Sequence, residues 1–342
     1  MRHNHYPHAS CRHFVARRTA ALRSLAIGLA ALTFGLPLAQ AMGLMVERAS
    51  AHCGIPPSAA AAPPAAAARR LPQSQAVAGQ RDIAWAWLGS PTRRYPHSAL
   101  GSPVHAGSLH VILRGGGPKG AEPKRLELSV KLPLNRVFED RAPRLFDLDG
   151  DGRDEILLVE SDALRGSALV VYGVSPVKGK APAKPAEPVE LVELVELARG
   201  PFTGSTFRWL NPVGVADFDG DGRADVASVT TPHIGGVLTL HHYQPPDLVP
   251  YAKAMDVSNH RMGALEQQLA AIVTQPHMRP TVLVPDMTRR ALHALRWDAP
   301  GQWHELADLM PLPAEVEKLT PLPDGACATL ANGSFVRVTL TP

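Results

Sequence analysis

The sequence has 342 residues, which is enough for one large domain or two small ones. Charged residues make up only 19% of the chain and aromatic residues 5%, whereas there are 28 Gly and 33 Pro, so the composition favours a turn-rich β architecture over a helical bundle. The formal net charge of +4 arises at the N-terminus and gives no reason to expect nucleic-acid binding.

Residues 1–41 have the features of an export signal. Five arginines and no acidic residues precede the apolar run Leu25–Leu38, and Ala39–Ala41 forms a small-x-small cleavage site. The alternative is an uncleaved anchor. After cleavage, 30 basic and 31 acidic residues remain, a net charge of −1, and no further stretch reaches 18 apolar residues. We therefore expect a periplasmic or secreted protein with no membrane span and no nucleic-acid partner.

Residues 42–73 are rich in Pro and Ala, and this composition predicts a flexible tether. Cys53 lies in this range, and Cys327 lies near the other end of the mature chain. In an oxidising compartment the two can form a disulfide, although two separate thiols are equally compatible with the sequence.

From residue 74 to the end, the chain repeats a sequence pattern, called here a phrase, that predicts two consecutive strands. Each copy is a short apolar strand, then a turn, then an alternating strand. The residues that precede the five copies are Asp82, Glu155, Asp225, Thr281 and Gly325, with spacings of 73, 70, 56 and 44. The long spacings contain insertions such as Ser175–Pro188.

Repeats of about 40–50 residues with several strands each are typical of propeller blades. The sequence therefore predicts an all-β fold in which residues 74–342 form a β-propeller with five visible blades, five to seven being compatible. A β-sandwich would not explain five copies of one phrase. The last copy shows three strands, so we expect the N-terminal part to complete the ring, which is then closed by N- and C-terminal strands. Gly263–Gln275 is compatible with either a helix or a strand.

Two nine-residue loops, 147–155 and 217–225, share one pattern of acidic residues and glycines. Carboxylates occupy positions 1, 3, 5 and 9, and Gly at position 6 permits a sharp turn. An oxygen-rich, flexible cage of this kind suits Ca²⁺ better than Mg²⁺, which prefers strict octahedral geometry. Position 12 lacks the Glu of an EF-hand, and a strand follows the loop, so a switch with moving helices is not expected. The alternative, acidic turns without an ion, is weakened by the repetition.

Leu148–Ile156 and Phe218–Val226 resemble the FG-GAP/VCBS repeat, which also occurs in the propellers of integrin α-chains. The resemblance implies a β-propeller with two Ca²⁺ sites, each between the first two strands of a blade. The ligands that it implies are Asp147, Asp149, Asp151, the Arg153 carbonyl and Glu155 in the first loop, and Asp217, Asp219, Asp221, the Arg223 carbonyl and Asp225 in the second. Glu155 departs from the usual Asp but retains a carboxylate.

The fourth copy of the repeat has no acidic loop, because Val273–Thr281 aligns with the loops without any carboxylate. This difference predicts that the loops stabilise the fold and perform no catalysis. We therefore expect a non-catalytic module that binds a protein or a glycan. The alternative is a lyase or hydrolase that acts on polysaccharide with carboxylates or His in a central channel. The repeats account for most acidic clusters and leave few acids for catalysis.

Overall fold

The computed structural model describes residues 43–54, 61–115, 126–177, 192–298 and 301–341. The expected export signal lies outside these residues, as does most of the expected insertion 175–188. The described chain is all-β, with only two short 3-10 helices, η1 (Ala51–Gly54) and η2 (Ala65–Arg69). No helix among the described residues is both long and apolar enough to cross a membrane.

A sheet of 13 strands contains three runs of four antiparallel strands. The first run is β2 (Val77–Ala78), β3 (Ile83–Thr92), β4 (His105–Leu113) and β5 (Leu126–Lys131). The second is β7 (Arg144–Phe146), β8 (Glu155–Asp162), β9 (Gly166–Pro176) and β10 (Val192–Arg199). The third is β11 (Leu210–Ala216), β12 (Asp225–Thr230), β13 (Val237–Gln244) and β14 (Asp247–Ala254).

Short pairings join these three runs into one sheet. The strand β6 (Arg136–Phe138) pairs with both β4 and β8, and a single parallel pair, Arg199 with Asp247, joins β10 to β14. The long sheet is therefore three four-stranded groups with narrow connections between them.

Two smaller sheets repeat the four-stranded arrangement. One contains β15 (Ala271–Val273), β16 (Thr281–Pro285), β17 (Ala291–Asp298) and β18 (Gln302–Glu305), with β19 (Met310–Pro311) also paired to β17. The other has the order β1-β22-β21-β20, with β1 (Gly43–Ala49), β20 (Val316–Leu322), β21 (Gly325–Leu330) and β22 (Phe335–Thr341). Among the described residues, none of the sheets closes on itself.

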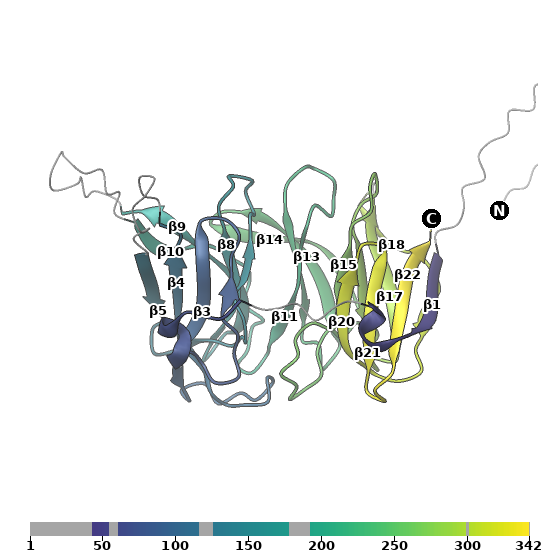
Figure 1. Ribbon diagram of the computed structural model, residues 1–342, viewed down its shortest axis with the longest axis horizontal. Coiled ribbons are helices and arrows are strands. Elements are labelled where there is room, and N and C mark those ends of the chain that lie inside the picture. Colours follow the sequence, from purple (N-terminus) through teal and green to yellow (C-terminus); the bar gives the residue numbers. More distant parts are fainter. Residues whose placement is uncertain (1–42, 55–60, 116–125, 178–191, 299–300, 342) are drawn as a thin grey trace, which may run out of the picture. The chain divides into compact units, whose positions relative to one another are not determined.

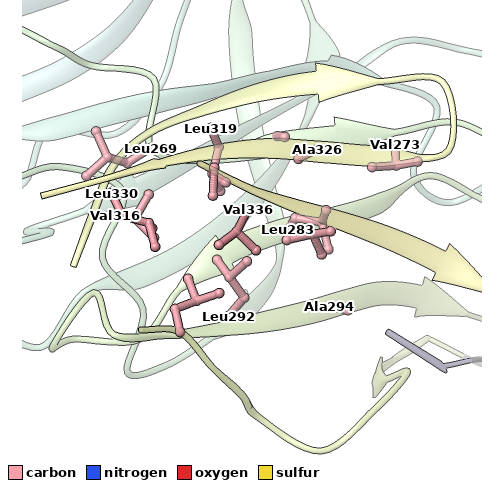
Figure 2. Packing of buried hydrophobic residues seen from close by; sticks show 14 of the residues in the cluster. Leu269, Val273, Leu283, Leu292, Ala294, Val316, Leu319, Ala326, Leu330 and Val336 are labelled. Atoms are coloured by element: carbon pink, nitrogen blue, oxygen red, sulfur yellow. The ribbon is translucent and has the colours of Figure 1, made fainter. Parts of the chain in front are cut away.

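The hydrophobic core lies between successive four-stranded groups. Figure 2 shows one part, where Leu283 and Leu292 of one small sheet point toward Val316 and Val336 of the other. Similar clusters lie between the first and second groups, the second and third, and the third and fourth. The second strands β8 and β16 are buried at every position, which explains why their central segments, 156–159 and 282–284, are short continuous apolar runs without alternation.

The N-terminal strand β1 completes the last sheet, as expected from its three visible strands. It pairs along its whole length with β22, from Gly43 opposite Thr341 to Ala49 opposite Phe335 (Figure 1). Immediately after it, Cys53 forms a disulfide with Cys327 of β21. The first and last parts of the described chain are thus joined by a ladder and a covalent bond.

The structure differs from the tether expected over residues 42–73. Gly43–Ala49 is a strand, because Val46 and its apolar neighbours pack on the last sheet. Farther on, Ala67 packs against Trp87, and Leu71 is fully buried with its N–H bonded to the Leu88 carbonyl. Composition averaged over the whole range hid these apolar positions. Residues 55–60 lie outside the described chain.

The repeated phrases are confirmed as paired strands. They correspond to β3–β4, β8–β9, β12–β13, β16–β17 and β21–β22. Gly263–Gln275, which fitted helix or strand, contains the short strand β15 at Ala271–Val273.

Candidate metal centres

The two acidic loops occupy equivalent places in two neighbouring groups. Loop 147–155 joins β7 to β8, and loop 217–225 joins β11 to β12, so each connects the first two strands of a group. Gly150 and Gly152 have φ values of 79° and 83°, and Gly220 and Gly222 have 74° and 86°. These left-handed conformations explain why glycine occupies positions 4 and 6 of both loops.

The backbone hydrogen bonds of the two loops match one by one. Asp147 accepts from the N–H groups of Gly150 and Gly152 at 2.8 and 3.1 Å. In the second loop, Asp217 accepts from Gly220 and Gly222 at 2.7 and 3.0 Å. The acids at positions 3 and 5 each accept from the N–H two residues on, at 3.1 and 2.8 Å in both loops. The two loops are therefore one local structure built twice.

Some of the expected ligand side chains converge, but Asp151 lies outside the first cluster and Asp225 outside the group formed by Asp217, Asp219 and Asp221. In the first loop, ligand atoms of Asp147, Asp149 and Glu155 all lie within 4.8 Å of one another. In the second loop the same holds for Asp217, Asp219 and Asp221. Acidic clusters of this size could hold a metal ion, since a cation would offset the repulsion among the carboxylates.

The acid at the last position of each loop is buried. Glu155 is 5% exposed and Asp225 only 1%. Burial raises the pKa of Glu155 to about 7; the Leu148 N–H opposes this shift and the neighbouring aspartates of the loop add to it. Burial also raises the pKa of Asp225, against hydrogen bonds from Tyr251 and His242. A bound cation would favour the ionised form of both groups.

His242 lies beside the second loop and is not among the ligands that the repeat implies. Its Nδ1 lies 3.0 Å from Asp225 Oδ1, and its Nε2 lies 4.0 Å from Asp219 Oδ2. The sequence signal is the β12–β13 register, which sets His242 directly opposite Asp225. The neighbouring His241 is buried and its Nδ1 bonds the Val226 carbonyl instead, because adjacent residues of a strand face opposite sides of the sheet.

Arginine side chains lie near the first loop, whereas His242 lies beside the second. Arg81 lies 3.6 Å from Asp147 and 3.0 Å from Asp154. Arg153 lies 3.5 Å from Asp82. The first cluster is therefore partly balanced by neighbouring cations, and the two sites differ in their surroundings although they share a backbone.

Both loops border one cavity of about 540 Å³. Asp147 and Asp149 line it from the first loop, and Asp217 and Arg223 line it from the second. Tyr243 of β13 lies between them, and burial together with the charges of the first loop raises its pKa.

The fourth group shows the same connection without acids, as expected. Val273 ends β15 and Thr281 begins β16, so the segment between them joins the first two strands of that group. The four-stranded group therefore forms without an acidic loop.

Several buried aromatic and amide side chains link different parts of the fold. Trp87 is buried and stacks on His110, and Trp209 is buried with its indole N–H bonded to the Glu139 carbonyl. Asn259 is fully buried and exchanges hydrogen bonds with Asn211 of β11. These contacts join strand to strand, loop to loop and loop to strand, respectively.

No protein-family model, curated protein or solved structure matches the chain.

Proposed function

We propose that the protein is an exported Ca²⁺-binding interaction module of the FG-GAP/VCBS type. In this proposal two Ca²⁺ ions stiffen the loops 147–155 and 217–225, and the protein binds a protein or glycan partner without catalysing a reaction. The observation that carries the proposal is the matched hydrogen-bond network of the two loops, each between the first two strands of a group.

The donor set supports calcium over other cations. Asp147, Asp149 and Glu155 offer only carboxylate oxygens, which hard cations prefer. The loops hold no cysteine, and imidazole is near only the second cluster. A nine-residue loop with two left-handed glycines can adjust to the six to eight ligands that Ca²⁺ takes.

The proposed architecture is a five-bladed β-propeller. Five four-stranded groups follow one another in the described chain, and apolar clusters lie between successive groups. A cavity of about 340 Å³ is lined by residues from all five regions of the chain, including Gln75, Arg144, Val213, Gln268 and Lys318. An experimental structure of residues 42–342 in which the first and last groups do not meet would contradict this arrangement.

The same cavity favours binding over polysaccharide cleavage. Among its described lining residues Glu266 is the sole acid, and it is ion-paired to Lys318 at 3.1 Å. Glycoside hydrolysis generally requires two carboxylates on either side of the bond. A cavity with one paired acid, several amides and arginines is better suited to holding a polar ligand.

Calcium titration of the mature chain, residues 42–342, tests the proposal. We expect two ions per chain by isothermal titration calorimetry, with one lost in Asp149→Ala and the other lost in Asp219→Ala. Asp308→Ala, which removes an exposed acid away from both loops, is the matched control and should retain both. Binding of no calcium by the wild-type chain would overturn the metal assignment.

The interaction role has a separate test. A glycan array and a pull-down from an envelope extract, each with calcium and with chelator, should give a partner retained only with calcium. Cleavage of an arrayed polysaccharide would instead support the enzymatic alternative.

A further inference from the structure

A second site lies at the other end of β12 from the acidic loop. The loop ends at Asp225, where the strand begins, whereas Thr231, just after the strand, lines a small pocket. A six-residue strand spans roughly 20 Å, so the two sites are separate. The pocket is lined by His97, Phe207, Arg208, Trp209, Thr231, His233, Ile234 and Met262.

The pocket has the size and surface of an aromatic ring site. Its volume is about 100 Å³, somewhat below the ~150 Å³ of an apolar cavity that holds benzene. Phe207 is 46% exposed, Ile234 71% and Met262 55%, so large apolar side chains surround its mouth. Methionine sulfur and aromatic faces both contact rings favourably. A sugar, with a hydroxyl on nearly every carbon, would find too few polar partners.

Buried hydrogen bonds fix the two histidines that face this pocket. His97 places Nδ1 2.6 Å from Glu139 Oε1, and the fully buried Glu139 carboxylate also accepts from Ser161 at 2.5 Å. This contact occupies Nδ1 of His97, so Nε2 is the remaining polar atom of the ring. Its ring also packs against Phe207, with centroids 5.3 Å apart.

A chain of hydrogen bonds determines which ring nitrogen of His233 carries the proton. His260 donates from Nε2 to the Ala264 carbonyl, so its Nδ1 accepts from His233 Nε2 at 2.8 Å. Burial lowers the pKa of both histidines, which keeps them neutral and holds this arrangement. Because Nε2 carries the proton of the neutral His233 ring, its Nδ1 is an acceptor. Within the described part of the chain, this Nδ1 has no hydrogen-bond partner. The ring lies parallel to Trp209.

Two residues that line the pocket have strained backbones. Phe207 has a φ of 60° and Thr231 a φ of 47°, conformations that bulky and β-branched residues rarely adopt. Hydrogen bonds hold both: the Phe207 N–H donates to the Tyr95 hydroxyl at 2.7 Å, and the Thr231 N–H donates to the Trp209 carbonyl at 2.8 Å. Strain maintained in this way is typical of ligand sites.

We propose that the pocket between His97 and His233 binds a single aromatic ring that carries a hydroxyl group. The apolar wall takes the ring, and the free imidazole nitrogens take the hydroxyl. The hydroxyl donates its single proton to the acceptor Nδ1 of His233, and its oxygen accepts a hydrogen bond from Nε2 of His97 where that atom carries a proton. The site does not depend on the metal loops or on the proposed function.

Ligand-observed NMR titrations of the mature chain, residues 42–342, test this site with three probes. Phenol should bind saturably. Cyclohexanol, which lacks the aromatic face, and anisole, which lacks the hydroxyl donor, should each bind at least fivefold more weakly. Absence of saturable phenol binding, or equal affinity for cyclohexanol, would overturn the proposal.

Two rim variants localise the binding. Ile234→Trp should weaken phenol binding at least tenfold by filling the mouth, and Met262→Trp provides a second blocking variant should the first not fold. Leu164→Trp is the matched control, because Leu164 is 83% exposed but does not line the pocket. Unchanged phenol affinity in a folded blocking variant would place the ligand elsewhere and refute the assignment.

Discussion

Glu155 and Asp225 are the residues through which the acidic loops reach the core. Each closes its loop by accepting a backbone hydrogen bond: Glu155 from the Leu148 N–H at 2.7 Å, and Asp225 from the Phe218 N–H at 3.3 Å. The two residues that donate are themselves buried. A carboxylate in this place fixes the loop against the core but needs a compensating charge when ionised.

Glu155→Gln should therefore raise the free energy of unfolding in chelator and lower it in calcium. Burial raises the pKa of Glu155 to about 7, above its usual value. Without metal, the protonated carboxyl therefore contributes to folding stability below about pH 4.5, and this contribution is lost as the pH rises through 7. We expect the variant to gain on the order of 2 kcal/mol relative to wild type at pH 8 in chelator. Urea unfolding of the variant and the wild type at pH 5 and pH 8 measures this difference in the free energy of unfolding. A difference independent of pH would argue against this carboxyl as the cause.

The paired histidines His233 and His260 should stay neutral under mildly acidic conditions. Burial lowers the pKa of His233 to about 4 and that of His260 to about 3; His97 adds to the shift at His233, and His233 adds to the shift at His260. Their contribution to stability is full above pH 6.5 and is lost as the pH falls toward 4, because the unfolded chain takes up protons first. NMR titration of the imidazole C–H signals should show no midpoint above pH 5 for either ring.

At the scale of elements, β1 and the Cys53–Cys327 bond close the last sheet together. The strand adds seven residue pairs to β22, and the bond joins residues 274 apart in sequence. The loop-entropy account gives about 5 kcal/mol for so long a loop, as an upper bound, and native disulfides typically contribute 2–5 kcal/mol. The N-terminal segment is thus a structural part of the domain.

Reduction of this bond should destabilise the protein by about 2–5 kcal/mol. Urea unfolding of the mature chain with and without reductant measures the loss, and thiol titration of the denatured, unreduced chain should find no free thiol. Cys53→Ser is the control: reductant should not affect it further, because its partner Cys327 then has nothing to bond. A reductant effect of the same size in that variant would contradict the assignment.

The whole molecule shows what the sequence could and could not predict. Strand pairs were predictable because short apolar runs and alternating strands recur in one order, and both acidic loops were predictable because all their groups lie within nine residues. The His97–Glu139 contact and the His242–Asp225 contact were not, because they depend on register and on loops far apart in sequence. Participation of the N-terminal part was expected, but which of its residues pack was obscured by composition: Val46 and Leu71 carry packing information that an average over a Pro- and Ala-rich range removes.

At this scale we expect calcium to raise the melting temperature of the mature chain. Each pair of like charges about 5 Å apart costs about 3 kcal/mol at an effective dielectric of 20, before screening by salt, so the ion-free loops are repulsive. A ligand present at 100 times its Kd stabilises the folded state by about 2.7 kcal/mol for each site. For a domain of this size, two sites correspond to a shift of roughly 10 °C.

Differential scanning calorimetry in calcium and in chelator measures this shift. The Asp149→Ala, Asp219→Ala double variant should lose it, and each single variant should retain about half. Because β8 and β12 begin at the ends of the two loops, the effect should appear as one cooperative transition and not as local melting. A melting temperature unchanged by excess chelator would show that the loops keep their shape by backbone hydrogen bonds alone.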